Sequence, residues 1–534
     1  MLEVVYLAFI PDLFHEGNHL FFLLEKNSIR SIEFTELTTL KKTLVCVEVK
    51  DLIDQLRNLG VTPPENIIDI EQARKLAVGI SVKNGGKKYW NAWSVLKKQG
   101  CHRENVTRFR SIFIGQTPIH SEANLDEIVR SFLNALRLAW IETVEILRSE
   151  KEYDRFCKIE FPTQNILNHR QGRGIKIDLL ELEKQYGLSR DEKYKAYIRV
   201  ATALKVSPSG FTFRTIRSHL KGTPLEALSD DPDVSRFEQK LKLASDNSSL
   251  AKDIFLFLRS DRDLKTLSRV SDETGRSFPS FTSVGTITSR VLVRNPYIQG
   301  LRKKHRSIIS PEAGFELVYV DYDQFEPGIL ASLSGDKNLI DLYESGDIYT
   351  ELASEVFNDK SKRSQAKQVF ISFLYGMSEN RIAQTISPGN PDAKASVDTL
   401  SVSINHFFSK FTKAMDYREV TRNELLKNGR VETLMGGHRK RSSSGPLSNI
   451  EKRWALSQKI QGTGSLIFKE AVMQISNILG VEVIVLPMHD AVLLQFKKGD
   501  VEEGKKLALD CMKKAMKNRC PHINPKVSVE SFSG

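Results

Sequence analysis

Residues 318–336, VYVDYDQFEPGILASLSGD, decide the fold. A short apolar run ends at Asp321, and after Glu326 the stretch continues with the small and apolar residues of a helix. A buried strand that delivers one carboxylate at its end is a common way to place a metal ligand in a cleft. Taken alone, a strand followed by an acidic turn is the better supported interpretation.

A second apolar strand of the same kind lies far along the chain. Residues 481–488, VEVIVLPM, run into His489 and Asp490, and an apolar segment follows. Two strands that each end on an aspartate supply what a pair of hard cations bridged by two carboxylates requires. Together the two stretches favour a two-cation site with Asp321 and Asp490 as ligands.

Composition indicates a soluble globular protein of two or three domains. The 534 residues are 40% hydrophobic and 27% charged, which is ordinary for this class. Lys and Arg outnumber Asp and Glu by 78 to 66, a weak indication of a polyanionic partner, since basic enzymes without one also exist. We find no membrane span, no convincing signal peptide and no metal-ligand spacing among the five cysteines. We therefore expect a cytoplasmic protein with reduced thiols and no membrane partner.

The pattern changes near residue 150. Residues 1–150 are mixed and hold no catalytic constellation, because their acids are isolated. From 151 the chain is more basic and helical, and Asp178 stands where it would cap the helix that follows. Within 1–150 we expect strands at Val4–Ile10, His19–Leu24 and Leu44–Val49, and helices at Ile53–Leu59, Glu71–Val78 and Leu125–Arg148.

A donor-rich stretch precedes residues 318–336. Between 281 and 310, hydroxyl, amide and guanidinium side chains interleave, among them Arg290, Asn295 and Gln299, and the basic run RKKHR occupies 302–306. This mixture is the donor set that holds sugars and phosphates in register. A basic run alone is usually a solvated face, but the amides favour nucleic acid as the partner.

Residues 363–376, RSQAKQVFISFLYG, form the third informative stretch. Arg363, Lys367, Ile371 and Tyr375 recur every four residues, so they lie along one stripe of a helix. Two cations followed by an apolar residue and an aromatic suit a nucleotide, with the cations on its phosphates and the ring beside its base. Taken alone, an amphipathic helix with solvated cations is the better supported interpretation.

From residue 404 to its end, the chain shows simple patterns of helix and strand. We expect a helix over 404–430, a strand at Val431–Leu434 and a basic turn at Gly436–Arg441. A long helix over Arg453–Leu479 carries a polar stripe that includes Gln461, and a strand-like tail ends the chain.

In order and spacing, these stretches resemble family A, the polymerase I-like DNA polymerases. Residues 321–326 (DYDQFE) are similar to motif A, 363–376 to motif B, and His489-Asp490 to motif C. The segments around 288–299, 429–436 and 453–463 are similar to the sequences that flank these motifs. Each motif is weak alone, but their shared order over about 280–500 is a strong signal.

The resemblance implies an α/β (α+β) right-hand polymerase fold and template-directed addition of deoxynucleotides to a primer 3′ end. It divides the chain into an exonuclease-like domain (1–150), thumb (151–280), first part of the palm (281–345), fingers (346–425) and second part of the palm (426–534). The first domain, of ribonuclease H-like α/β type, matches only faintly around Ile68-Asp69 and lacks two of the exonuclease motifs. We therefore expect a degenerate 3′–5′ exonuclease domain that does not proofread.

The resemblance also implies a role for individual residues. Asp321, Asp490 and the carbonyl of Tyr322 would hold two Mg²⁺ ions, for which Mn²⁺ can substitute. Glu326 would exclude a ribose 2′-hydroxyl. The implied nucleotide-binding residues are Gln324, Glu326, Arg363, Lys367, Ile371 and Tyr375, and the implied DNA-binding residues are Arg290, Asn295, Gln299, Arg453, Gln461 and His489. The expected partners are primer–template DNA, deoxynucleoside triphosphates and replication accessory proteins, for a monomer of phage or mobile-element type in a bacterial cytoplasm.

The chain departs from the family pattern, and two alternatives stay open. Pro327-Gly328 stands where Leu-Arg is usual, Ala491 replaces a Glu, Ile371 an aromatic residue and Ser457 an Asn. A single-subunit, phage-type RNA polymerase is favoured by Ala491 and disfavoured by Glu326. A catalytically inactive nucleic-acid-binding relative predicts the loss of a metal-binding aspartate, and both are present.

Overall fold

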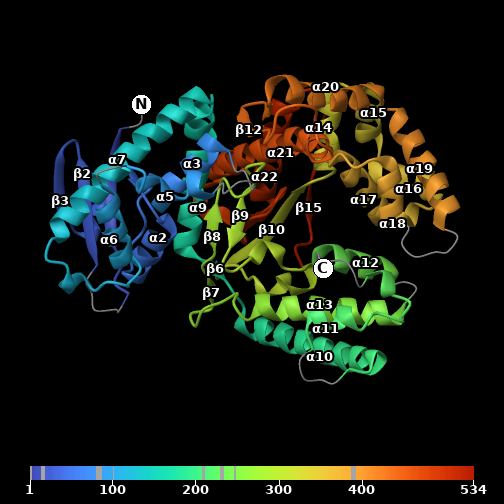
Figure 1. Ribbon diagram of the computed structural model, residues 1–534, viewed down its shortest axis with the longest axis horizontal. Coiled ribbons are helices and arrows are strands. Elements are labelled where there is room, and N and C mark those ends of the chain that lie inside the picture. The colour runs from blue at the N-terminus through green and yellow to red at the C-terminus, as the bar shows by residue number, and fades with distance from the viewer. Residues whose placement is uncertain are drawn as a thin grey trace.

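The computed structural model describes residues 3–13, 19–79, 87–99, 102–206, 211–228, 234–245, 248–386 and 393–533. An amino-terminal lobe lies beside a larger body that carries two helical projections (Figure 1). No helix in these ranges is long and apolar enough to cross a membrane. Four of the five cysteines lie in the described ranges as free thiols, and Cys101 lies outside them.

A five-stranded mixed sheet forms the core of the amino-terminal lobe, in the order β3-β2-β1-β4-β5. Its central strand β1 (Val4–Ile10) is apolar along its length because both faces are covered. β1 pairs antiparallel with β2 (Leu20–Glu25) and parallel with β4 (Thr43–Cys46), and the edges are β3 (Ser28–Ile32) and β5 (Ile67–Asp69). The strand predicted over Leu44–Val49 stops early because Val49 begins helix α2 (Val49–Asn58).

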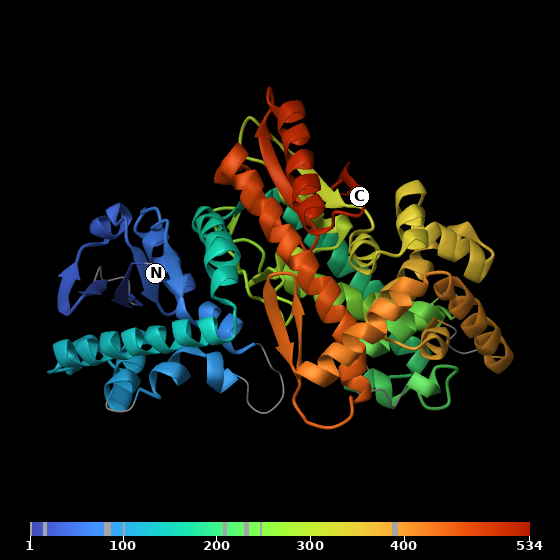
Figure 2. The same cartoon turned by 90° about the horizontal axis from the view of Figure 1, so that it is seen from above.

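Helices pack on this sheet as the periodicity predicts. α3 (Ile70–Val78), α6 (Arg103–Phe113) and α7 (Leu125–Ser149) enclose an aromatic core in which Phe109 stacks on Phe132 at 3.9 Å. Figure 2 shows α7 running along one side of the sheet, where it contacts β1, β2 and β4.

An antiparallel helix pair forms the lower projection in Figure 1. α10 (Leu179–Leu204) packs along α13 (Ser249–Leu267), and α11 (Phe213–Ser218) and α12 (Val234–Ala244) cover one end. Asp178 caps α10 by accepting a hydrogen bond from the backbone N–H of Glu181 at 3.0 Å, as predicted. The pair has its own core of buried side chains, among them Val200, Ile216 and Phe237.

The central sheet is antiparallel, in the order β13-β14-β10-β15. β10 (Phe315–Tyr322) lies between β14 (Ala491–Lys497) and the carboxyl-terminal strand β15 (Val527–Glu530). The predicted strand at 481–488 is shorter than expected: β13 covers Ile484–Pro487, and Val481–Val483 form a 3₁₀ turn in which Glu482 pairs with His169. The long helices α21 (Asn449–Leu479) and α22 (Val501–Arg519) pack together beside this sheet.

A second helical lobe follows β10. It comprises α14 (Phe325–Ser334), α15 (Lys337–Ser345), α16 (Ile348–Phe357), α17 (Arg363–Leu374), α18 (Glu379–Ile386), α19 (Ala393–Ser409) and α20 (Thr412–Asn428). The prediction of a single helix over 404–430 is therefore wrong, because α19 ends at Ser409 and a separate helix, α20, begins at Thr412. Its predicted end is correct, since Gly429 takes the left-handed conformation that closes α20.

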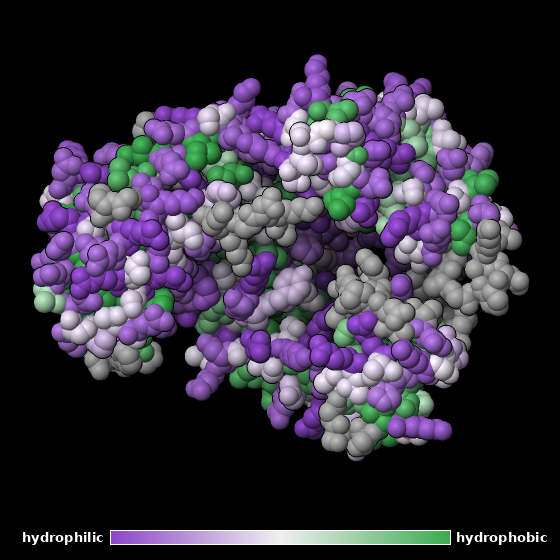
Figure 3. All heavy atoms as spheres, viewed as in Figure 1, coloured by the Kyte–Doolittle hydropathy of each residue, from purple (hydrophilic) through white to green (hydrophobic). Residues whose placement is uncertain are grey.

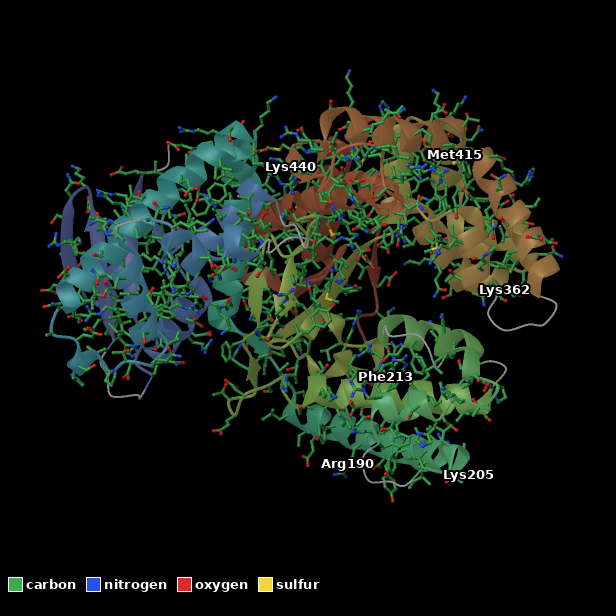
Figure 4. All side chains as sticks on the ribbon, viewed as in Figure 1. Arg190, Lys205, Phe213, Lys362, Met415 and Lys440 are labelled. Carbon is green, nitrogen blue, oxygen red and sulfur yellow. The ribbon has the colours of Figure 1, made fainter. Side chains whose placement is uncertain are left out.

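A hairpin joins this lobe to α21. β11 (Arg430–Thr433) pairs with β12 (Gly436–Lys440), so the predicted basic turn at 436–441 is largely a strand. Gly436 and Gly437 have positive φ, and the Gly437 backbone N–H donates to Glu152 at 2.8 Å, which holds the hairpin against the segment after α7. Figure 4 shows Lys440 beside the end of α7, where its Nζ lies 2.6 Å from Glu150.

Candidate active site

The two predicted aspartates meet at the end of the central sheet. Asp321 is the penultimate residue of β10 and lies opposite Ala491 of β14, which places Asp490 directly beside it. The backbone N–H of Tyr322 donates to the Asp490 carbonyl at 3.4 Å and holds this arrangement. Two segments 169 residues apart therefore bring one carboxylate each to the same place.

The electrostatics of Asp321 suit a divalent cation. Its Oδ1 atom is buried and has no hydrogen-bond partner in the described part of the chain. Burial raises the pKa of Asp321, and the neighbouring carboxylates of Asp490, Glu530 and Asp323 raise it further. A cation between Asp321 and Asp490 would relieve both effects. Among the described residues no group of three or more His, Cys, Asp or Glu side chains could hold a metal. The adjacent carboxylates of Asp321 and Asp490 offer two oxygen donors.

The cationic stripe of α17 faces outward as the spacing predicts. Arg363 and Lys367 are exposed, Ile371 is partly buried, and Tyr375 is 39% exposed. Tyr375 is the predicted ring of this stripe. The aromatic residue that is usual in the family at position 371 is absent, and Phe370 does not replace it. Phe370 is fully buried against the rings of Tyr349, Phe373 and Phe408.

Tyr349 of α16 was not identified from the sequence, although it organises this stripe. The Arg363 guanidinium and the Lys367 ammonium lie 5.3 and 5.7 Å from the centre of its ring. Arg363 also pairs with Asp347 at 2.6 Å. Burial raises the pKa of Tyr349, and Glu326 contributes to the rise, so the ring borders the site. Only its closeness to motif A along the sequence could have suggested Tyr349, because no spacing pattern identifies a single tyrosine as a site residue.

Gln324 connects motif A to α16. Its side chain accepts from the Ile348 backbone N–H at 2.7 Å and donates to the Gly346 carbonyl at 3.2 Å. These contacts hold the first turn of α16, and with it Tyr349, next to the end of β10.

A cavity of about 210 Å³ brings five predicted residues together. Gly464 of α21 also lines it and lets α21 pack closely on α14, since a Cβ there would lie 3.1 Å from the Phe325 ring. The predicted residues that line the cavity are Arg290, Glu326, Gln461, His489 and Asp490.

One arginine joins opposite walls of this cavity. Arg290 forms an ion pair with Glu326, whose Oε2 atom is buried without a partner in the described chain. Tyr375 lies near both Arg290 and Gln461: burial raises the pKa of Tyr375, and these two neighbours oppose the rise.

The end of α17 rests on α21. Gly376 has a φ of 72°, and a Cβ there would lie 2.5 Å from the Arg453 Cα. This close contact fixes the end of α17, where Tyr375 lies near the cavity residues Arg290 and Gln461. The Arg453 side chain itself is exposed and donates to the Asn449 carbonyl of its own helix at 3.2 Å.

Gln299 and Asn295 occupy different environments. Gln299 is buried, accepts from the Val293 backbone N–H at 3.1 Å and donates to the Pro487 carbonyl at 2.8 Å, so in this structure it braces β13. Asn295 is exposed and lines a second cavity of about 760 Å³ between α13 and β9 (Leu292–Arg294). Four cations line it: Arg262, Lys265, Arg269 and Arg294. Figure 3 shows a hollow with hydrophilic residues between the two helical projections.

Comparison with known proteins agrees with this geometry. Residues 240–531 match the model of DNA polymerase family A. The chain is 28% identical over 401 residues to "DNA polymerase I, thermostable" of Thermus caldophilus, covering 67% of this chain and 46% of that protein. It is 30% identical over 264 residues to DNA polymerase I of Chloroflexus aurantiacus, covering 46% of this chain and 27% of that protein. The chain thus spans about half the length, or less, of these relatives.

A solved structure extends the likeness to nearly the whole chain. The "POL domain of Pol1 from M. smegmatis", in complex with DNA primer-template and dNTP, superposes with a TM-score of 0.75 at 19% identity, covering 99% of this chain and 95% of that one. The predicted polymerase fold is therefore confirmed, while the nature of residues 1–150 stays a prediction. On the match to the family model, the chain belongs to DNA polymerase family A.

Proposed function

We propose that the protein is a DNA-directed DNA polymerase, a nucleotidyltransferase that extends a primer 3′ end with deoxynucleoside triphosphates in DNA replication. The observation that carries this proposal is the position of Asp321 and Asp490, side by side next to a cavity and facing a lobe with a cationic stripe. Family membership supports it, as does the likeness to a polymerase solved with primer-template and dNTP.

The same likeness supports the predicted division of the chain. We assign the α10–α13 pair to a thumb (151–280) and the helices from α16 to most of α20 to fingers (346–425). The central sheet belongs to a palm made of 281–345 and 426–534.

Asp321 and Asp490, with the Tyr322 carbonyl, would hold two Mg²⁺ ions, or Mn²⁺ in their place. Bound there, the ions would lower the pKa of the primer hydroxyl and stabilise the leaving pyrophosphate. Arg363 and Lys367 would bind the triphosphate, with Tyr349 beneath them as an apolar support that keeps both cations in place. Tyr375 would lie beside the template base.

The DNA contacts follow from the two cavities. Arg290, Gln461 and His489 would meet the primer terminus and its paired base in the smaller cavity, near Arg453. The larger, cationic cavity beside Asn295 suits a duplex backbone, because four cations can displace the counterions of phosphates. Gln299 would affect DNA binding indirectly, because its hydrogen bond to the Pro487 carbonyl supports β13.

Glu326 separates the main proposal from an RNA polymerase. Its carboxylate lines the cavity next to Asp490, where it would occupy the space of a ribose 2′-hydroxyl. The inactive relative is disfavoured because both aspartates are present and adjacent.

We further propose that residues 1–150 are a degenerate exonuclease domain without proofreading activity. β1, the central strand of this domain, carries no acidic residue, so it lacks the two-acid first motif that the exonuclease activity would need. A labelled primer with a 3′ mismatch tests this: we expect no Mg²⁺-dependent shortening. A phage or mobile-element origin and a cytoplasmic location stay predictions.

Primer extension on a DNA template tests the polymerase activity. We expect deoxynucleotide incorporation that chelation of divalent cations stops and that Asp490→Ala abolishes. Asp500→Ala is the control, because Asp500 is exposed at the opposite end of β14. Activity in the Asp490 variant, or equal use of ribonucleotides by the wild type, would contradict the proposal.

A further inference from the structure

Arg290 is held in place by its own loop and by α21. The Thr286 hydroxyl oxygen accepts from the Arg290 backbone N–H at 3.1 Å, and the Arg290 carbonyl accepts from Gly285 at 3.0 Å. The carbonyl of the preceding residue, Ser289, accepts from the Ser465 hydroxyl of α21. The guanidinium is therefore presented to the cavity by a fixed backbone.

This guanidinium is shared by two residues of different elements. It forms an ion pair with Oε1 of Glu326 at the start of α14, and it lies near Tyr375 at the end of α17, where its charge opposes the rise in the pKa of Tyr375 that burial causes. The side chains of Arg290 and Glu326 are 26% and 13% exposed, so the pair is largely shielded from water. In the described chain, the second oxygen of Glu326 has no partner. Arg290 is thus the contact that defines the orientation of this carboxylate.

Position 371 of α17 carries no ring that could pack against Glu326. Ile371 is aliphatic, and Phe370 is fully buried in the aromatic core of the lobe. The position of Glu326 consequently depends on Arg290 more than it would beside a packed ring.

We propose that Arg290 is the positioning residue for sugar discrimination: by orienting the Glu326 carboxylate, it determines how well the enzyme selects deoxyribonucleotides over ribonucleotides. This inference rests on the proposed polymerase function. Without Arg290, the Glu326 side chain can rotate away, and a 2′-hydroxyl then finds room. The effect of Arg290 on the sugar passes through Glu326, with which it is paired.

A double-mutant cycle tests the inference with single-nucleotide incorporation. The measured quantity is kcat/KM for a deoxynucleotide divided by kcat/KM for the ribonucleotide with the same base. Arg290→Gln is expected to lower this ratio about tenfold, and Glu326→Ala at least as much. The double variant is expected to fall no further than Glu326→Ala, because removing the carboxylate leaves Arg290 nothing to position.

Two further variants complete the design. Arg290→Lys keeps the charge without the planar fork, so its ratio is expected between wild type and Arg290→Gln, and it decides the question if the Gln variant does not fold. Arg276→Gln breaks an Arg–Glu pair of 2.8 Å with Glu312 away from the cavity and is expected to keep the wild-type ratio.

The outcomes separate the inference from the function on which it rests. If Arg290→Gln reduces kcat/KM equally for both sugars, or if the double variant loses selectivity additively, Arg290 acts on the primer alone and the inference is wrong. A wild-type protein that incorporates no deoxynucleotide overturns the proposed function and the inference together.

Discussion

The carboxylate of Glu152 accepts a hydrogen bond from His438 Nδ1 at 2.6 Å, and both side chains are 1% exposed. This contact joins the segment after α7 to the β11–β12 hairpin, 286 residues further along the chain. Around it, Arg155 donates to the Thr433 hydroxyl at 3.1 Å, and Lys469 of α21 pairs with Glu160 at 2.6 Å. A buried ionic network therefore anchors the amino-terminal lobe to the β11–β12 hairpin and α21.

Glu152→Ala is expected to reduce the free energy of unfolding by about 3–5 kcal/mol, because it leaves His438 and the Gly437 N–H buried without a partner. Burial alone would raise the pKa of Glu152, but the donors from His438 and Gly437 outweigh it and lower the pKa. Denaturant unfolding near neutral pH measures the loss. Asp154→Asn is the control: it breaks a pair whose side chains are 65% and 76% exposed, which contributes about 0–1 kcal/mol. Equal destabilisation by both variants would show that the network does not anchor the lobe.

The start of α21 provides a pH-dependent contribution to stability. Ser448 and Glu451 form a capping box, and the hydrogen bond from Arg441 is the main reason that the pKa of Glu451 falls to about 2. Since this folded-state pKa lies below the unfolded value, the stabilisation is complete above about pH 4.5 and is lost as the pH falls toward about 2. At neutral pH, Glu451→Gln is expected to cost about 1–2 kcal/mol.

Unfolding curves at several pH values test this, and the difference between wild type and variant should shrink below about pH 4.5. Glu502→Gln, in the first turn of α22, is the matched control because the Glu502 side chain is 87% exposed. A wild-type advantage that stays constant down to pH 2 would rule out the ionised Glu451 as its source.

The stretches that the sequence singled out carry most of the site. Strands ending at Asp321 and Asp490, and the four-residue spacing of Arg363 to Tyr375, follow from local periodicity, and the structure brings them to one place. Tyr349 and the Arg290–Glu326 pair could not be found in this way, because they depend on which elements become neighbours. The same limit explains the hairpin at Gly436–Lys440. Its glycines and basic residues read locally as a turn, whereas distant Glu152 and Arg155 hold it as a strand.

Tyr349 is expected to matter through its ring and not through its hydroxyl. Tyr349→Ala removes the support beneath Arg363 and Lys367 and should raise KM for the incoming nucleotide about tenfold, within the range of two cation–π contacts. Tyr349→Phe keeps the ring and should stay within about twofold of wild type. Steady-state primer extension at varied nucleotide concentration gives both values. A Phe variant as impaired as the Ala variant would place the role in the hydroxyl.

The departure at Pro327-Gly328 has a structural cause. Both residues lie in the first turns of α14, where Pro327 is tolerated because the N–H groups there have no partner within the helix. A Cβ on Gly328 would lie 2.8 Å from the Tyr343 ring, and that ring is held because its hydroxyl accepts from the Lys526 backbone N–H at 3.1 Å. Tyr343 therefore occupies the space that a larger side chain at 328 would need.

Gly328→Ala is expected to destabilise the protein by about 1–3 kcal/mol through overpacking, although alanine favours helices. Gly187→Ala in α10 is the control: no atom lies within 4 Å of its added Cβ, so the gain in helix propensity should appear as a stabilisation of up to about 1 kcal/mol. Thermal unfolding of the two variants gives shifts of opposite sign if this packing holds. Because α14 carries Glu326, Gly328→Ala should also lower the preference for deoxyribonucleotides, whereas Gly187→Ala should leave it unchanged. A Gly328 variant as stable as wild type would show that Tyr343 can move aside. Contact with the Tyr343 ring would then not explain why position 328 is glycine.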